Sequence, residues 1–214
     1  MYQRGSGGLG EGRQVAAFIH LNPEGTTMRT HSLRITLALI GATTLALPAL
    51  AEERQCTGRI GAIALDNVYV PNGATCVLSS SRLNGNIVVG TGATLTASSV
   101  TVNGSVQAEG ARSVTVNGRS IIGGSVQLVQ GYAANVSGAT VAGTILFDEN
   151  TGPVVAYRNR VNGDVQLFAN RGGATVSENQ IKGNLQCKEN TPAPTTGTGA
   201  GNRAASKEDQ CAAL

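Results

Sequence analysis

A glycine recurs at a nearly constant interval through the middle of the chain, and this repeat constrains the fold more than any other feature. In nearly every copy an apolar residue lies two positions before the glycine and another lies two positions after it. The glycines are Gly85, Gly104, Gly124, Gly143, Gly163 and Gly183. Residues 67–75 match residues 86–94 at an offset of 19, which adds a further copy. Seven related units therefore cover roughly residues 57–187, as in a solenoid protein.

Within each unit the pattern is that of a half-buried strand. If the glycine is position 0, positions −2, +2 and +4 are apolar, whereas +1 and +3 are mostly polar. This period of two places one face inside and one outside. Val, Ile and Thr are frequent, and a unit of about 20 residues suits one coil of three short strands. We predict an all-β, single-stranded parallel β-helix of about seven coils. The lack of a strict hexapeptide repeat favours a right-handed coil.

Four cysteines fit the ends of such a solenoid. Cys76 aligns with Leu95, an inward position, and Cys56 lies 20 residues earlier, one coil below. Cys187 occupies the inward +4 position of the last coil, and Cys211 lies in the tail. Stacked coils bring Cα atoms into the range that a disulfide bridges. We predict the pairs Cys56–Cys76 and Cys187–Cys211, one per end. A zinc site is the competing interpretation, but the spacings lack a Cys-x-x-Cys cluster.

Two further sets of residues share one offset from coil to coil. Asn150, Asn170 and Asn190 form one set, and Asn159 and Asn179 form the other. Such columns predict ladders of side-chain amides at the coil corners, where they hydrogen-bond with the backbone of the turns.

The region before the repeat resembles an export signal. From Met28 a basic start precedes an apolar run at 35–47, and Ala49 and Ala51 occupy the positions that signal peptidases prefer. The run is shorter than the roughly 20 residues needed to span a bilayer. We expect a Sec signal peptide at 28–51, cleaved after Ala51, and a secreted or periplasmic protein without a transmembrane segment. Residues 1–27 are then a mis-assigned upstream extension or a disordered leader.

After removal of the leader, the solenoid domain covers 52–187 and a cap or tail rich in Pro, Gly and Thr covers 188–214. Four of the 16 Lys and Arg and two of the 13 Asp and Glu precede residue 52, which leaves 12 against 11. No run of Lys or Arg remains, so we expect no nucleic-acid partner. Both histidines, His20 and His31, also lie in the leader. This argues against His-based catalysis and His metal sites, and we expect no metal and no cofactor.

The outward positions of the coils are the candidate binding surface. Position +1 is Asn, Ser, Thr or Asp throughout, and position +3 is Gln in four coils. A flat strip of amides and hydroxyls suits hydrogen bonding to a polysaccharide, an envelope surface, a protein or another copy of the chain. The candidate residues are Asn86, Gln107, Gln127, Asp164, Gln166 and Gln186. The alternative is that these are ordinary solvated strand residues without a binding role. The absence of Trp weakens the sugar hypothesis, because aromatic platforms supply contact area.

An enzyme acting on polysaccharides, a lyase or a hydrolase, is the alternative function. Charged residues gather in the later coils: Asp148, Glu149, Arg158, Arg160, Asp164, Arg171 and Glu178. However, Arg158 and Glu178 share one offset and are expected to form a surface ion pair. Asp148 stacks with Phe168 rather than with a second acid. A calcium-assisted lyase needs carboxylates that converge on one groove. We therefore expect a non-catalytic structural or binding module.

The recurring Val-x-Gly-[Asn/Asp/Ser/Thr]-[Val/Ile/Leu] coils at 57–187 resemble those of bacterial right-handed β-helix proteins and, loosely, the polymer-forming bactofilins. Bactofilins are cytoplasmic and lack a signal peptide and cap disulfides, and this chain departs from them on both points. The segments around Cys187 and Cys211 resemble the tails of secreted bacterial proteins, which implies export.

Overall fold

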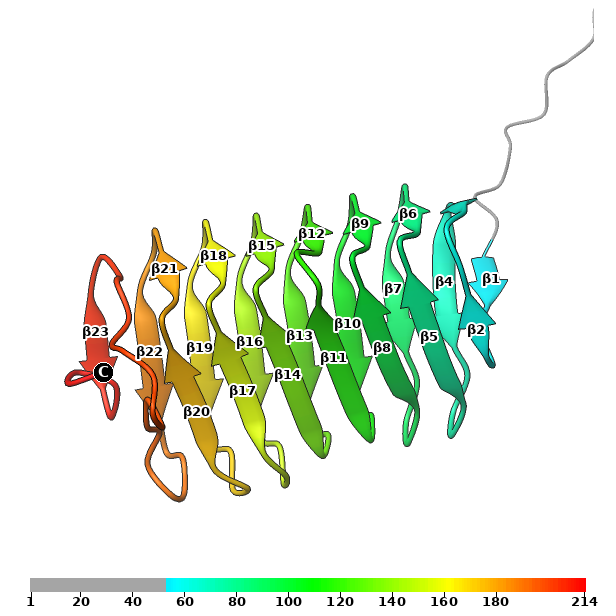
Figure 1. Cartoon of the computed structure of the whole chain (residues 1–214). Coiled ribbons are helices and arrows are strands. Elements are labelled where there is room, and N and C mark those ends of the chain that lie inside the picture. Colours follow the sequence, from blue (N-terminus) through cyan, green and yellow to red (C-terminus); the bar gives the residue numbers. More distant parts are fainter. Residues whose placement is uncertain (1–52) are drawn as a thin grey trace, which may run out of the picture. The chain divides into compact units, whose positions relative to one another are not determined.

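The computed structural model describes residues 53–214, which form a β-solenoid of about eight turns (Figure 1). Each full turn contributes one strand to each of three parallel sheets. The predicted fold class is confirmed, and the repeat's seven coils are extended by end strands that lack the glycine motif. The predicted leader, signal peptide and cleavage site lie outside the described residues.

The three sheets run along the solenoid, and each is a row of parallel strands. Sheet A comprises β1 (Glu53–Gln55), β4 (Asn67–Val70), β7 (Ile87–Val89), β10 (Val106–Glu109), β13 (Val126–Val129), β16 (Ile145–Asp148), β19 (Val165–Phe168), β22 (Leu185–Lys188) and β23 (Lys207–Asp209). Sheet B comprises β2 (Arg59–Ile60), β5 (Thr75–Ser79), β8 (Thr94–Ser98), β11 (Ser113–Asn117), β14 (Ala133–Ser137), β17 (Val154–Tyr157) and β20 (Ala174–Ser177). Sheet C comprises β3 (Ala64–Leu65), β6 (Arg82–Leu83), β9 (Thr101–Val102), β12 (Ile121–Ile122), β15 (Thr140–Val141), β18 (Arg160–Val161) and β21 (Gln180–Ile181).

Apolar side chains of successive turns stack in columns along the axis. In sheet A, Ala108, Leu128 and Phe147 are in register and point inward. Phe147 is fully buried, and Val154 and Ala156 are the buried residues of β17 in sheet B of the same turn. Because each turn buries its side chains against its neighbours, no turn has a core of its own.

The repeat glycine is required by the side chain stacked against it. A Cβ at Gly104 would collide with Oδ1 of Asn86 in the preceding turn. That oxygen accepts a hydrogen bond from the backbone N–H of Ser105 at 2.8 Å, and Asp164 accepts one from Asn184 at 2.8 Å. The polar residue at position +1 therefore completes the backbone hydrogen bonding at the corner between sheets C and A.

The two predicted asparagine ladders are confirmed. Asn170 Nδ2 donates to Asn190 Oδ1 and to the Phe147 carbonyl, both at 2.9 Å. Asn159 Nδ2 donates to Asn179 Oδ1 at 3.0 Å. The cap extends both ladders, with residues that the offsets did not reveal: Gln210 continues from Asn190, and Asn202 from Asn179.

Both predicted disulfides are present. The Cα atoms of Cys56 and Cys76 are 5.4 Å apart, and those of Cys187 and Cys211 are 5.3 Å apart. The segment 188–214 is more than a loop, because it adds a final turn: β23 pairs with β22, and isolated bridges join Thr195 to sheet B and Arg203 to sheet C. Disulfides indicate an oxidising compartment. Among residues 53–214, no helix is long and apolar enough to cross a membrane.

Candidate functional site

Position +3 places one side chain of every turn on the outer face of sheet A, and these side chains form a column in register. Neighbouring members of the column are one strand spacing apart, about 4.8 Å. From the first full turn to the cap the column is Tyr69, Val88, Gln107, Gln127, Leu146, Gln166, Gln186 and Glu208.

The expected flat strip is hollowed at its N-terminal half. A groove with a volume of about 860 Å³ crosses β4, β7, β10 and β13. Gly90 lines it as well and contributes no side chain. A Cβ there would collide with Oδ1 of Asn72, which accepts a hydrogen bond from the Thr91 N–H at 3.0 Å. The turn that holds Asn72 thus requires a glycine at position 90.

The groove combines an apolar floor with polar side chains. Tyr69 and Val88 lie side by side in the floor, and Val88 is 39% exposed. Gln107 and Gln127 follow in the same column, and Glu109 lines the groove beside them. Each amide offers both donors and an acceptor, and the carboxylate offers acceptors. Within the described chain, neither glutamine side chain makes a hydrogen bond, so both remain available to a ligand.

The structure places the six candidate residues in three different settings: the groove, a ladder of amides and the corners of the turns. Only Gln107 and Gln127 line the groove. Gln166 Nε2 donates to Gln186 Oε1, and Gln186 Nε2 donates to Glu208, each at 2.8 Å, so these amides form a ladder of their own. The corner contacts described above hold Asn86 and Asp164 away from the groove. That these four bind a ligand stays a prediction.

Sequence reasoning overlooked three contributors to the groove. Tyr69 and Val88 belong to the +3 column, which the sequence predicts to be a polar strip, and Glu109 lies two positions after Gln107. Gly90 carried a signal of its own, because a glycine beside a strand indicates a close approach of another part of the chain, here Asn72.

The acidic residues of the late coils lie at different corners of the turn. Asp148 ends β16 in sheet A, Asp164 precedes β19, and Glu178 follows β20 in sheet B. Burial, and then the charge of Glu149, raise the pKa of Asp148. The hydrogen bond from Arg158 lowers the pKa of Glu178, and the predicted ion pair is confirmed with Nε to Oε2 at 2.7 Å. Within residues 53–214, no three His, Cys, Asp or Glu side chains gather as a metal site would require.

No protein-family model, no curated protein and no solved structure matches the chain. The structure shows stacked parallel coils, and no comparison supports the finer resemblance to bactofilins.

Proposed function

We propose that this chain is an exported, non-catalytic binding module whose groove on sheet A recognises a neutral glycan. The observation that carries the proposal is the groove itself, in which half-buried Tyr69 and exposed Val88 lie beside two amides that no other described side chain engages. Export is supported by the signal-like pattern at 28–51 and by two disulfides, which persist in oxidising compartments.

The shape and charge of the groove favour a sugar chain. It crosses four strands, a length of about 14 Å at the usual strand spacing. An oligosaccharide lying along the solenoid axis can stack one ring face on Tyr69, while its hydroxyls exchange hydrogen bonds with Gln107 and Gln127. Glu109 is the charged side chain among the lining residues, and no Lys or Arg of the described chain lines the groove, which disfavours an anionic ligand.

The first experiment incubates the purified protein, with both disulfides formed, with cell-wall and extracellular polysaccharides. Bound protein and released reducing or unsaturated ends are recorded together. Binding without product is the expected result. Release of product would replace the proposal with the enzymatic alternative. Failure to bind any polysaccharide would point to a protein partner or a structural role.

Variants then locate the binding. Tyr69→Ala should weaken binding about fivefold and the pair Gln107→Ala/Gln127→Ala about thirtyfold, since each lost contact is worth about 1 kcal/mol. Gln166→Ala is the matched control, because Gln166 stands in the same column but outside the groove. Equal losses in all three proteins would contradict the groove as the site.

A further inference from the structure

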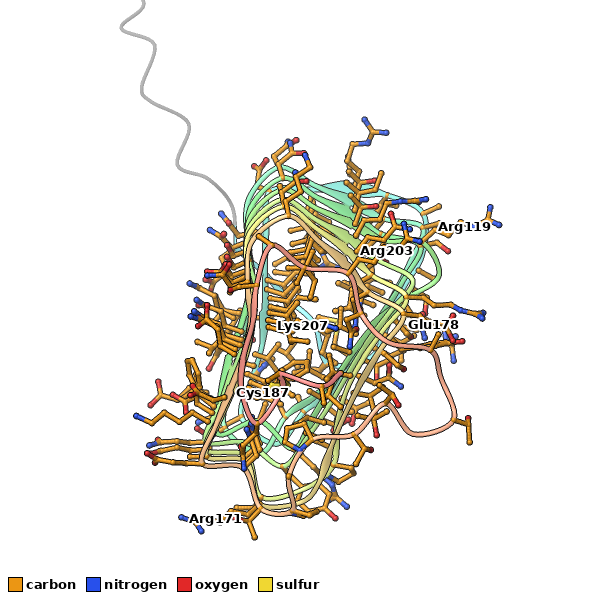
Figure 2. The ribbon with its side chains drawn as sticks, turned by 90° about the vertical axis from the view of Figure 1, so that its left-hand side faces the viewer. Arg119, Arg171, Glu178, Cys187, Arg203 and Lys207 are labelled. Carbon is orange, nitrogen blue, oxygen red and sulfur yellow. A yellow bond between two sulfur atoms is a disulfide. The ribbon has the colours of Figure 1, made fainter. Side chains whose placement is uncertain are left out.

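A second groove, with a volume of about 590 Å³, lies over the C-terminal end of sheet C and carries three cationic side chains. Arg160, Gln180 and Arg203 are in register, and Lys182 lies beside Gln180 in the next outward position. All three cations are exposed. Figure 2 shows Arg203 at one end of the cross-section and Arg171 at the opposite end.

These cations lack acidic partners in the described chain, where the ion pairs involve Arg158 with Glu178 and Lys188 with Glu189. Two acids of the same turns make contacts elsewhere. Glu178 bonds with Arg158, and Asp164 accepts the backbone N–H of Asn184. The groove therefore keeps a local positive charge although the solenoid as a whole is close to neutral.

The spacing of the three cations indicates how the charges of a ligand must be spaced to contact all of them. Arg160 and Arg203 are two strand spacings apart, about 9.6 Å, with Lys182 at the level between them. A single exposed ion pair contributes little in water, so a ligand gains affinity here by presenting several charges in register. Guanidinium groups bind carboxylates in a bidentate manner. Duplex DNA carries one charge per about 1.7 Å and needs a much denser array of cations.

We propose that this basic groove binds a linear acidic polysaccharide whose carboxylates recur along the chain, with the polymer lying parallel to the solenoid axis. The site is separate from the groove on sheet A in position and in charge, and it does not depend on the function proposed for that groove.

The test measures the affinity of the protein for polygalacturonate and hyaluronate oligomers at low salt, with dextran, dextran sulfate and single-stranded DNA as comparison probes. The double variant Arg160→Gln/Arg203→Gln should weaken uronate binding at least tenfold. Arg171→Gln, which removes one exposed arginine elsewhere, should change it less than twofold. Added salt should weaken binding by the parent protein more than binding by the double variant.

Tyr69→Ala separates the two sites, because it should leave uronate binding unchanged. The proposal is overturned if the double variant binds uronates as tightly as the parent does. It is also overturned if single-stranded DNA or dextran sulfate binds the parent more tightly than both uronate polymers, which would show that charge density rather than carboxylate spacing is recognised.

Discussion

Asp148 shows how the stacking of turns changes the chemistry of a single residue. Its side chain lies on the outer face of sheet A, in register with Val129 on one side and Phe168 on the other. These neighbours remove water from the carboxyl group, and Glu149 adds a second negative charge, so that the pKa of Asp148 is raised. Folding therefore disfavours the ionised carboxylate of Asp148 relative to the unfolded chain.

The variant Asp148→Asn should be more stable than the parent at pH 7. A raised folded-state pKa stabilises the fold below the unfolded pKa of about 4, and this contribution is lost as the pH rises through the folded-state value. Because asparagine cannot ionise, the variant avoids that loss. Denaturant unfolding at pH 3 and pH 7 measures the difference. An equal gain at both pH values would show that ionisation is not the cause.

At the scale of residues, the sequence predicts those contacts that depend only on the number of residues between neighbouring turns. The asparagine ladders and the Arg158–Glu178 pair each join residues at one position in neighbouring turns, and each disulfide joins cysteines about one repeat apart, at separations of 20 and 24 residues. Spacings of about one repeat reveal all of these contacts directly. The groove on sheet A depends instead on the particular outward side chains of four adjacent turns, which vary from copy to copy. The basic groove escaped detection because Arg203 pairs with Gln180 at a longer separation than one repeat, after the cap loop has broken the periodicity.

At the scale of elements, the buried asparagine ladder connects turns that sheet hydrogen bonds already join. Asn170 satisfies the Phe147 carbonyl through Nδ2, and its Oδ1 accepts from the backbone N–H and the Nδ2 of Asn150. All of these groups are at a buried corner, where an unpaired polar group costs about 1–3 kcal/mol. The ladder thus stabilises the corner between sheets A and B, where no continuous strand does so.

Asn170→Ala should lower the free energy of unfolding by about 3 kcal/mol, because it leaves a carbonyl and an N–H unpaired within the corner. Asn103→Ala is the matched control: Asn103 is exposed, and its replacement should change stability by less than about 0.5 kcal/mol. Denaturant unfolding gives both values, and hydrogen exchange at Asn150 should accelerate in Asn170→Ala only. Similar losses in the two variants would contradict the structural role of the ladder.

At the scale of the whole solenoid, the C-terminal cap provides hydrogen-bond acceptors to all three sheets at once. The Val176 N–H donates to Thr195, that of Ile181 to Arg203, and that of Leu185 to Ser206, at 2.9, 2.8 and 2.9 Å. Without these partners the last turn presents three unpaired strand edges, which are templates for pairing with another chain. The cap therefore ends a stack that otherwise has no intrinsic stopping point.

A chain ended after Lys188, with Cys187→Ser to avoid a free thiol, should self-associate through this bare end. The control is the full chain with Cys187→Ser/Cys211→Ser, in which the cap hydrogen bonds remain but the covalent tether is lost. That control should lose about 3 kcal/mol of stability, as expected for a loop of this length, and keep the sedimentation behaviour of the parent. Sedimentation velocity distinguishes the two outcomes. If the shortened chain sediments as a monomer, edge pairing is blocked by something other than the cap. If the control also associates, the disulfide rather than the hydrogen bonding is what holds the cap against the stack.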